Sequence, residues 1–167
     1  MVPHAIFAQM TPALASQVFG FLFEKEKPLY KATIEALAKK RNLRPIFVER
    51  KPRDERFLWI KDALSRQVND AVAAHILQVW LVGAQSAVLC DFLDALGIAH
   101  DENGTVEELP GAPELEKIKT AVDTLLAKHE AGVVAIYLHT FQALHDQGGW
   151  PTLGEVLDAD PRLKLSA

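Results

Sequence analysis

Four polar side chains interrupt an otherwise apolar stretch, from Ala71 to Cys90, that has no charged residue; they are His75, Gln78, Gln85 and Ser86. On a helical wheel all four fall within one arc of roughly 100°, with Trp80 opposite. An imidazole, two amides and a hydroxyl on one face could hold a small polar ligand. The alternative is that these groups bond to neighbouring helices or to water, as such groups usually do. The four residues are therefore our candidate ligand pocket.

A second set of residues could bind an anionic partner. Eight basic side chains fall between positions 39 and 56: Lys39, Lys40, Arg41, Arg44, Arg50, Lys51, Arg53 and Arg56. Phe47 and Trp59 lie within or beside this segment, and basic side chains with aromatics are the composition that contacts phosphates and stacks on bases. We therefore take the segment as a nucleic-acid candidate. Its alternatives are cations at a helix end, a solvated connector, and pairing with the acidic second half of the chain.

Signatures of catalysis and of metal binding are missing. The sequence has no Glu-x-x-His and no His-Glu-x-x-His, and a single cysteine cannot build a thiolate zinc site. It also has no Gly-x-Ser-x-Gly, no Gly-x-Gly-x-x-Gly and no P-loop. Cys90 lies in an apolar run before Asp91, which favours an inert thiol. We expect no catalytic residues, no metal and no cofactor, so the protein is not predicted to be an enzyme.

The charge is divided unevenly along the 167 residues. Residues 1–66 contain thirteen Lys and Arg against seven Asp and Glu, whereas residues 67–167 contain five against fifteen. This asymmetry indicates either a basic surface for an anionic partner or complementary packing of the two halves. The single cysteine and a start, MVPHAIFAQM, unlike a signal peptide predict a cytoplasmic protein.

Helical periodicity runs through most of the chain. Thr11-Pro12 has the types of an N-cap and a first helical residue, and the next helix is expected to end in cations at residues 39–41. We predict one domain, 1–167, with a helical hairpin 11–43, an extended connector 44–53, core helices 54–97, a loop 98–112 and C-terminal helices 113–160. Within 54–97 the apolar face changes sides, which predicts a break near Asn69, a second break near Gly83, and a C-cap at Gly97.

The uncharged stretch 71–90 is long enough to cross a bilayer, about twenty residues. A lone span would expose a histidine and two glutamines to hydrocarbon, which is costly. We therefore predict a core helix and no membrane partner. The predicted fold is all-α: a compact irregular bundle of six or seven helices with the helix around Ala71–Cys90 at its centre.

These observations predict a non-catalytic helical interaction module that binds a protein partner or a second copy of itself. The run FGFLF at residues 19–23 holds more aromatics than one helix face needs, which indicates burial on both sides, by the domain or by a second copy. Nucleic-acid binding through the Lys39–Arg56 segment is the first alternative. Binding of a small ligand at the His75 seam is the second.

Overall fold

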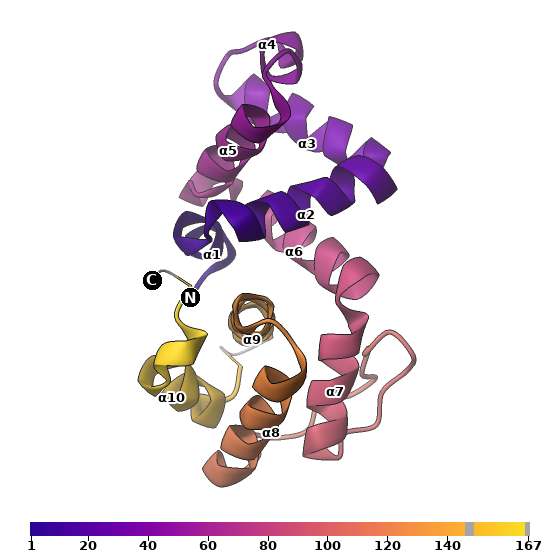
Figure 1. Ribbon diagram of the computed structural model, residues 1–167, viewed down its shortest axis with the longest axis vertical. Helices are drawn as coiled ribbons and strands as arrows, with labels where there is room; N and C mark the ends of the chain where they lie inside the picture. The colour runs from indigo at the N-terminus through magenta and orange to yellow at the C-terminus, as the bar shows by residue number, and fades with distance from the viewer. Residues whose placement is uncertain (146–148, 166–167) are drawn as a thin grey trace. The chain divides into compact units, whose positions relative to one another are not determined.

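The computed structural model describes residues 1–145 and 149–165. Throughout these residues the chain is all-helical, with ten α-helices and no strand (Figure 1). It divides into two compact units, Val2–Trp80 and Leu81–Leu165, and each is described by itself below. The prediction of a single domain over 1–167 stays a prediction.

The unit Val2–Trp80 begins with α1 (Pro3–Gln9) and α2 (Pro12–Lys25), followed by α3 (Lys27–Lys40), α4 (Pro45–Glu49) and α5 (Arg53–Leu64). Several boundaries follow the sequence signals. The Thr11 hydroxyl oxygen accepts a hydrogen bond from the Leu14 amide, and Pro12 occupies the first turn of α2. Helix α3 ends in Lys39 and Lys40, whose charges suit the negative end of its dipole.

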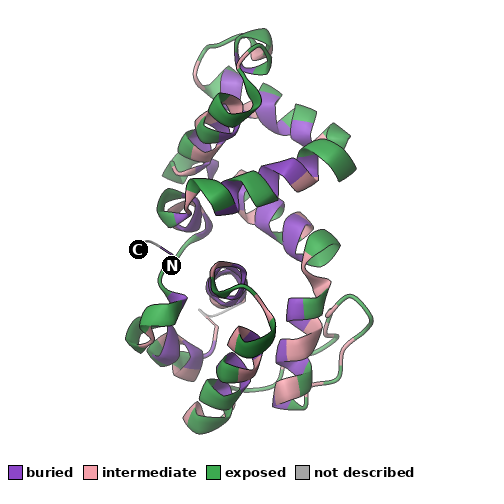
Figure 2. Ribbon diagram, viewed as in Figure 1, coloured by how far each residue is buried: buried purple, intermediate pink, exposed green. Residues whose placement is uncertain are grey.

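The core of this unit lies between α1, α2, α3 and α5. Phe7 stacks on Phe19 with ring centres 5.8 Å apart, and Phe19 in turn contacts Phe57. Ile34, Leu37, Ile60 and Leu64 are also buried in this core. By contrast, α4 joins α3 to α5 at the far end of the unit and is mostly exposed (Figures 1 and 2).

The second unit contains the last turn of α6 (Asp70–Ala84) and then α7 (Ser86–Leu96), α8 (Leu115–Lys128), α9 (Ala131–Leu144) and α10 (Pro151–Ala159). Gly97 adopts φ 69° and caps α7, as predicted. Helix α9 is buried from Val133 to Phe141. An aromatic cluster forms where α7, α9 and the start of α10 meet: Phe92, Tyr137, Phe141 and Trp150.

Three local expectations need correction. The helices number ten in the described residues, not six or seven. The connector 44–53 is not wholly extended, because α4 forms there with Pro45 in its first turn. The second break in 54–97 falls at Gln85 and not at Gly83, whereas the first lies at the short 3-10 helix Gln67–Asn69, as predicted. That the Ala71–Cys90 region is the centre of the fold stays a prediction.

None of the helices in the described residues is by itself both long and apolar enough to cross a membrane. One pair, Gln67–Ala84 with Ser86–Leu96, reaches the necessary length and hydropathy only when joined across a sharp bend.

Candidate interaction surface

Three exposed apolar side chains of the basic segment lie on and before α4. Asn42 adopts a left-handed φ of 55° and reverses the chain after α3, so that α4 starts three residues later. Of its five residues only Val48 is buried. Phe47 is 58% exposed and Ile46 42%, and Leu43 before the helix is 39% exposed.

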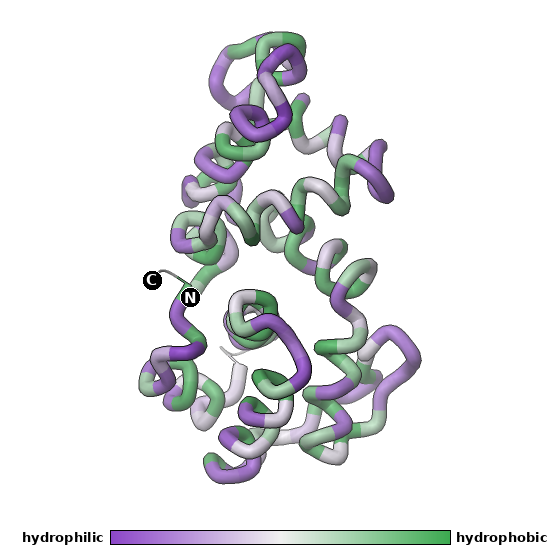
Figure 3. Tube along the Cα trace, viewed as in Figure 1, coloured by the Kyte–Doolittle hydropathy of each residue, from purple (hydrophilic) through white to green (hydrophobic). Residues whose placement is uncertain are grey.

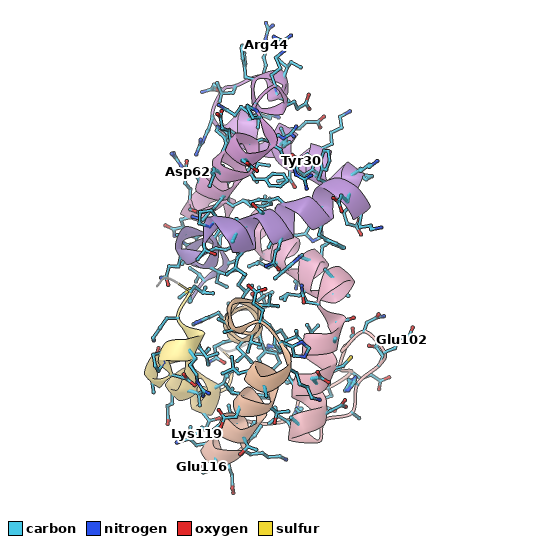
Figure 4. All side chains as sticks on the ribbon, viewed as in Figure 1. Tyr30, Arg44, Asp62, Glu102, Glu116 and Lys119 are labelled. Atoms are coloured by element: carbon cyan, nitrogen blue, oxygen red, sulfur yellow. The ribbon has the colours of Figure 1, made fainter. Side chains whose placement is uncertain are left out.

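Four of the eight predicted basic residues lie within a few positions of these apolar side chains in the chain and have no partner in the described residues. Among the described residues, none forms an ion pair or a side-chain hydrogen bond with Lys39, Arg44, Arg50 or Lys51. The Arg44 side chain extends away from α4 (Figure 4). We call Leu43, Ile46, Phe47 and these four cations the α4 surface, in which hydrophilic and hydrophobic residues alternate closely (Figure 3).

The other four basic residues are held within the unit. Lys40 Nζ donates to the Val68 carbonyl and to Asn69 Oδ1, both at 2.9 Å. Arg41 donates to Asp62 at 2.7 Å and lies 5.0 Å from the Trp59 ring centre. That pairing holds the pKa of Asp62 below its ordinary value. The predicted basic segment is therefore two sets of cations with different surroundings.

Arg53 and Arg56, the remaining two, pack against aromatic rings. Arg53 lies over both Phe23 and Phe57, at 5.3 and 5.2 Å from the ring centres, and Arg56 lies 5.6 Å from that of Phe23. Tyr30 meets Phe23 edge-on between α2 and α3 (Figure 4). Burial raises the pKa of Tyr30, although the two nearby arginines act to lower it. The partly exposed ring of Phe23, in the run FGFLF, thus contacts two arginines of its own unit.

The predicted ligand pocket is distributed over two helices. His75 and Gln78 lie exposed on α6, while Gln85 is the break residue and Ser86 starts α7, both half-buried. A wheel drawn for one straight helix therefore does not describe the four together. Ligand pockets are lined by convergent, buried polar groups, which these exposed and half-buried residues do not form, and their ligand role stays a prediction.

Hollows in the described surface lie elsewhere. One of about 330 Å³ separates α8 from α10 and is floored by Val122 and Val156, with Lys119, Asp123 and Arg162 at its rim. Arg162 donates to both oxygens of Asp160 and to Asp123, so its charge is already matched. This hollow has an apolar floor, and among its charged lining residues only Glu155 has no described partner. One exposed carboxylate is not enough to select a ligand.

No described group of three or more His, Cys, Asp or Glu could hold a metal ion. The Cys90 thiol is half-buried, and burial together with Asp94, Asp91 and Asp101 raises its pKa. A raised pKa means less thiolate and a weaker nucleophile. Cys90 is thus not activated in this structure.

Sequence reasoning identified the eight cations and Phe47 but missed Leu43 and Ile46, and it did not connect Phe23 or Tyr30 with Arg53 and Arg56. The proline at position 45 followed by two apolar residues is a signal for a short helix that the expectation of an extended connector overlooked. No protein-family model matches the chain, and comparison with curated proteins and with solved structures finds no match.

Proposed function

We propose that this protein is a non-catalytic helical interaction module that binds an acidic protein segment through the α4 surface. The observation that carries the proposal is three exposed apolar side chains flanked along the chain by four cations that have no partner in the described residues. Protein interfaces combine an apolar centre with a polar rim in the same way. The cations would steer a negatively charged partner and set its register, while the apolar side chains would supply most of the affinity.

The size of the patch bears on the strength of binding. Burying a large apolar side chain contributes about 1.5–3 kcal/mol, and these three are already partly covered. After the cost of association, the α4 surface alone supports weak, reversible binding rather than a permanent complex. Such binding should weaken as salt screens the cations, over a Debye length of about 8 Å at physiological ionic strength.

The test is site-specific cross-linking in the cells that make the protein. A photoreactive residue replaces Phe47 in one variant and Leu58 in a control, because Leu58 is 48% exposed but lies on α5 away from the four cations. Support requires a protein captured at position 47 and not at 58, through an acidic segment. The purified partner must then bind at least about tenfold more weakly to Arg44→Glu/Arg50→Glu. Equal capture at both positions would contradict the proposal.

A second copy of the chain is the first partner to measure, because residues 67–167 carry fifteen acidic side chains. Sedimentation velocity over a concentration series should show association that decreases with salt and with Phe47→Ala. A strict monomer at every concentration would exclude the homodimeric form and leave binding to a different protein.

Nucleic-acid binding through the Lys39–Arg56 segment is the alternative that the same unpaired cations favour. Phe47 is the exposed aromatic of the α4 surface, whereas Trp59 is half-buried under Arg41 and less open to stacking. Fluorescence anisotropy with a single-stranded oligonucleotide separates the two proposals. Affinity should fall steeply with salt if phosphates are bound, and weak binding with no such slope would remove this alternative.

Ligand binding at His75, Gln78, Gln85 and Ser86 is the second alternative. It is tested by the double substitution His75→Leu/Gln85→Leu and native mass spectrometry. A co-purifying small molecule present in the wild type and lost in this variant would support it. A bare chain in both would argue against it.

A further inference from the structure

Two arginines of α5, one helical turn apart, stand against a single ring of α2. The guanidinium carbons of Arg53 and Arg56 lie 5.3 and 5.6 Å from the centre of Phe23. Arg53 is half-exposed and Phe23 is 36% exposed, so solvent reaches both. Both side chains are cationic, and like charges on neighbouring side chains repel each other. An arrangement of this kind gains from an anion that contacts both groups.

The acceptors that the unit provides are few and distant. Glu24 Oε1 is 3.7 Å from Arg53 Nη2, too long for a hydrogen bond. Arg56 Nη1 donates to the Glu49 backbone carbonyl at 3.3 Å, and no described carboxylate forms an ion pair with Arg56. A guanidinium group offers five N–H donors, which the structure leaves largely unused.

Two buried polar groups lie beside this pair, the Nε of Arg56 and the hydroxyl of Tyr30. Neither has a well-formed hydrogen bond in the described residues, although a side-chain contact with Arg56 acts to lower the pKa of Tyr30. Tyr30 as a whole is 8% exposed. Buried donors without an acceptor are uncommon in folded proteins and call for an explanation. Here both lie beside two cations whose acceptors are a carboxylate 3.7 Å from Arg53 and a single backbone carbonyl at Arg56.

Gly20 leaves room for the arginine that faces it. A β-carbon at this position would lie 3.3 Å from Arg53 Nη2, tighter than ordinary contact. Gly20 is buried inside α2, where glycine lowers helix stability relative to alanine. The missing side chain therefore permits the Arg53 guanidinium to lie close to α2.

We propose that Arg53 and Arg56 form a binding site for an oxyanion, a phosphate or carboxylate group, seated against Phe23 with the Tyr30 hydroxyl as a further donor. Planar guanidinium forks match the spacing of two oxygens on such a group. The site does not use the four unpaired cations of the α4 surface. It is independent of the partner proposed for that surface.

The test titrates the full chain with inorganic phosphate, and separately with glutarate, at constant ionic strength, and follows backbone amide NMR shifts. Wild type should show saturable shifts around Gly20 and Phe23. The double variant Arg53→Gln/Arg56→Gln should bind at least about tenfold more weakly, as expected for loss of two charge-assisted contacts. The matched control Arg44→Gln/Arg50→Gln removes the same charge from the α4 surface and should bind within about twofold of wild type.

Gly20→Ala provides a second variant if the double variant fails to fold. It adds a favourable helix residue while displacing Arg53, so it should keep the fold and weaken oxyanion binding. Saturation by phosphate or by glutarate that depends on Arg53 and Arg56 supports the site and identifies its chemistry. Shifts that never saturate, or an equal loss in both double variants, would overturn it, because net charge alone would then explain the effect.

Discussion

The cations of the α4 surface and the cations of the second unit that contact carboxylates have different surroundings. Around α4 in the unit Val2–Trp80, Lys39, Arg44, Arg50 and Lys51 have no described partner. In the unit Leu81–Leu165, Arg162 contacts Asp160 and Asp123 at 2.6 and 2.8 Å, and Lys128 Nζ lies 3.8 Å from an Asp91 oxygen. The first set is free to meet another molecule, whereas the second set joins one element of its own unit to the next.

Exposure alone does not separate these two sets. The Arg162 side chain is 53% exposed, yet it links the turn after α10 to α8. The distinction lies in the neighbouring carboxylates, and it predicts different responses to substitution. Substituting a cation that has a partner in its own unit, or a residue that positions this cation, should lower the free energy of unfolding. Substituting a cation of the α4 surface that has no described partner should alter binding and leave the free energy of unfolding unchanged.

The largest effect is expected in the loop between α7 and α8 of the second unit. Gly104 has φ 77°, and a β-carbon there would lie 2.5 Å from Leu89 Cβ. Gly104→Ala combines a left-handed strain with a steric clash and should lower the free energy of unfolding by about 2–4 kcal/mol. Gly111→Ala is the matched control, since nothing lies within 4 Å of its β-carbon position. Urea unfolding measures both, and similar losses would mean that the loop is not packed as described.

The next effect concerns Asn69 and Lys40, which are joined by a hydrogen bond in the first unit. Asn69 is 3% exposed, and its amide donates to the Ala63 carbonyl at 2.7 Å while its oxygen accepts from Lys40. Asn69→Ala removes this buried hydrogen bond, leaving the Ala63 carbonyl with only the Arg66 amide at 3.3 Å, and should cost about 1–1.5 kcal/mol. Lys40→Met removes only the exposed partner and should cost about 0.5 kcal/mol. If thermal unfolding showed equal losses of stability for Asn69→Ala and Lys40→Met, the contribution would come from the lysine contact and not from the buried Asn69 hydrogen bond.

Local signals predicted the helix boundaries well, because caps act over a few residues. Thr11-Pro12, the cations ending α3, the break at Asn69 and Gly97 all agree with the structure. The helix count was too low, since α4 was taken as extended and the breaks divide 54–97 into three α-helices.

The division of the basic segment could not be predicted from the sequence. Arg41 finds Asp62 twenty-one positions away, and Arg53 meets the Phe23 ring thirty positions away in the chain. Such pairings depend on how helices pack, which periodicity does not report. The candidate polar face failed as one surface for a similar reason, because the wheel assumed a straight helix across Gln85.

A smaller effect compares one cation from each set. Arg162→Ala removes contacts to Asp160 and Asp123 and should cost about 0.5–1 kcal/mol, the upper range for exposed pairs. Arg50→Ala on the α4 surface removes no described contact and should change stability by less than about 0.3 kcal/mol. Chemical denaturation at low and high salt checks both, because only the Arg162 loss should shrink as salt rises.

The smallest effect is a pH dependence at the loop after α7. His100 places Nε2 at 2.7 Å from an Asp94 oxygen and Nδ1 at 2.6 Å from the Asp101 carbonyl. Both partners are acceptors, so both ring nitrogens must carry protons, and neutral imidazole has only one. The backbone contact to Asp101 and the bond to Asp94 accordingly raise the pKa of His100. Since its folded-state pKa lies above the unfolded value of about 6.5, its stabilisation is complete below that pH and disappears as pH rises through the folded pKa.

His139 should respond in the opposite direction. Burial lowers its pKa, and Nε2 donates to the Leu163 carbonyl at 3.0 Å, which suits the neutral ring. Its stabilisation is present above about pH 6.5 and is lost as pH falls through the lower folded pKa. Proton NMR titration should therefore show His100 titrating above, and His139 below, a histidine in the unfolded chain. The free energy of unfolding of His100→Gln should lie below that of the wild type at pH 5.5, and this difference should decrease as pH rises to 8.5. A difference that does not change with pH would show that the charged ring does not stabilise the loop.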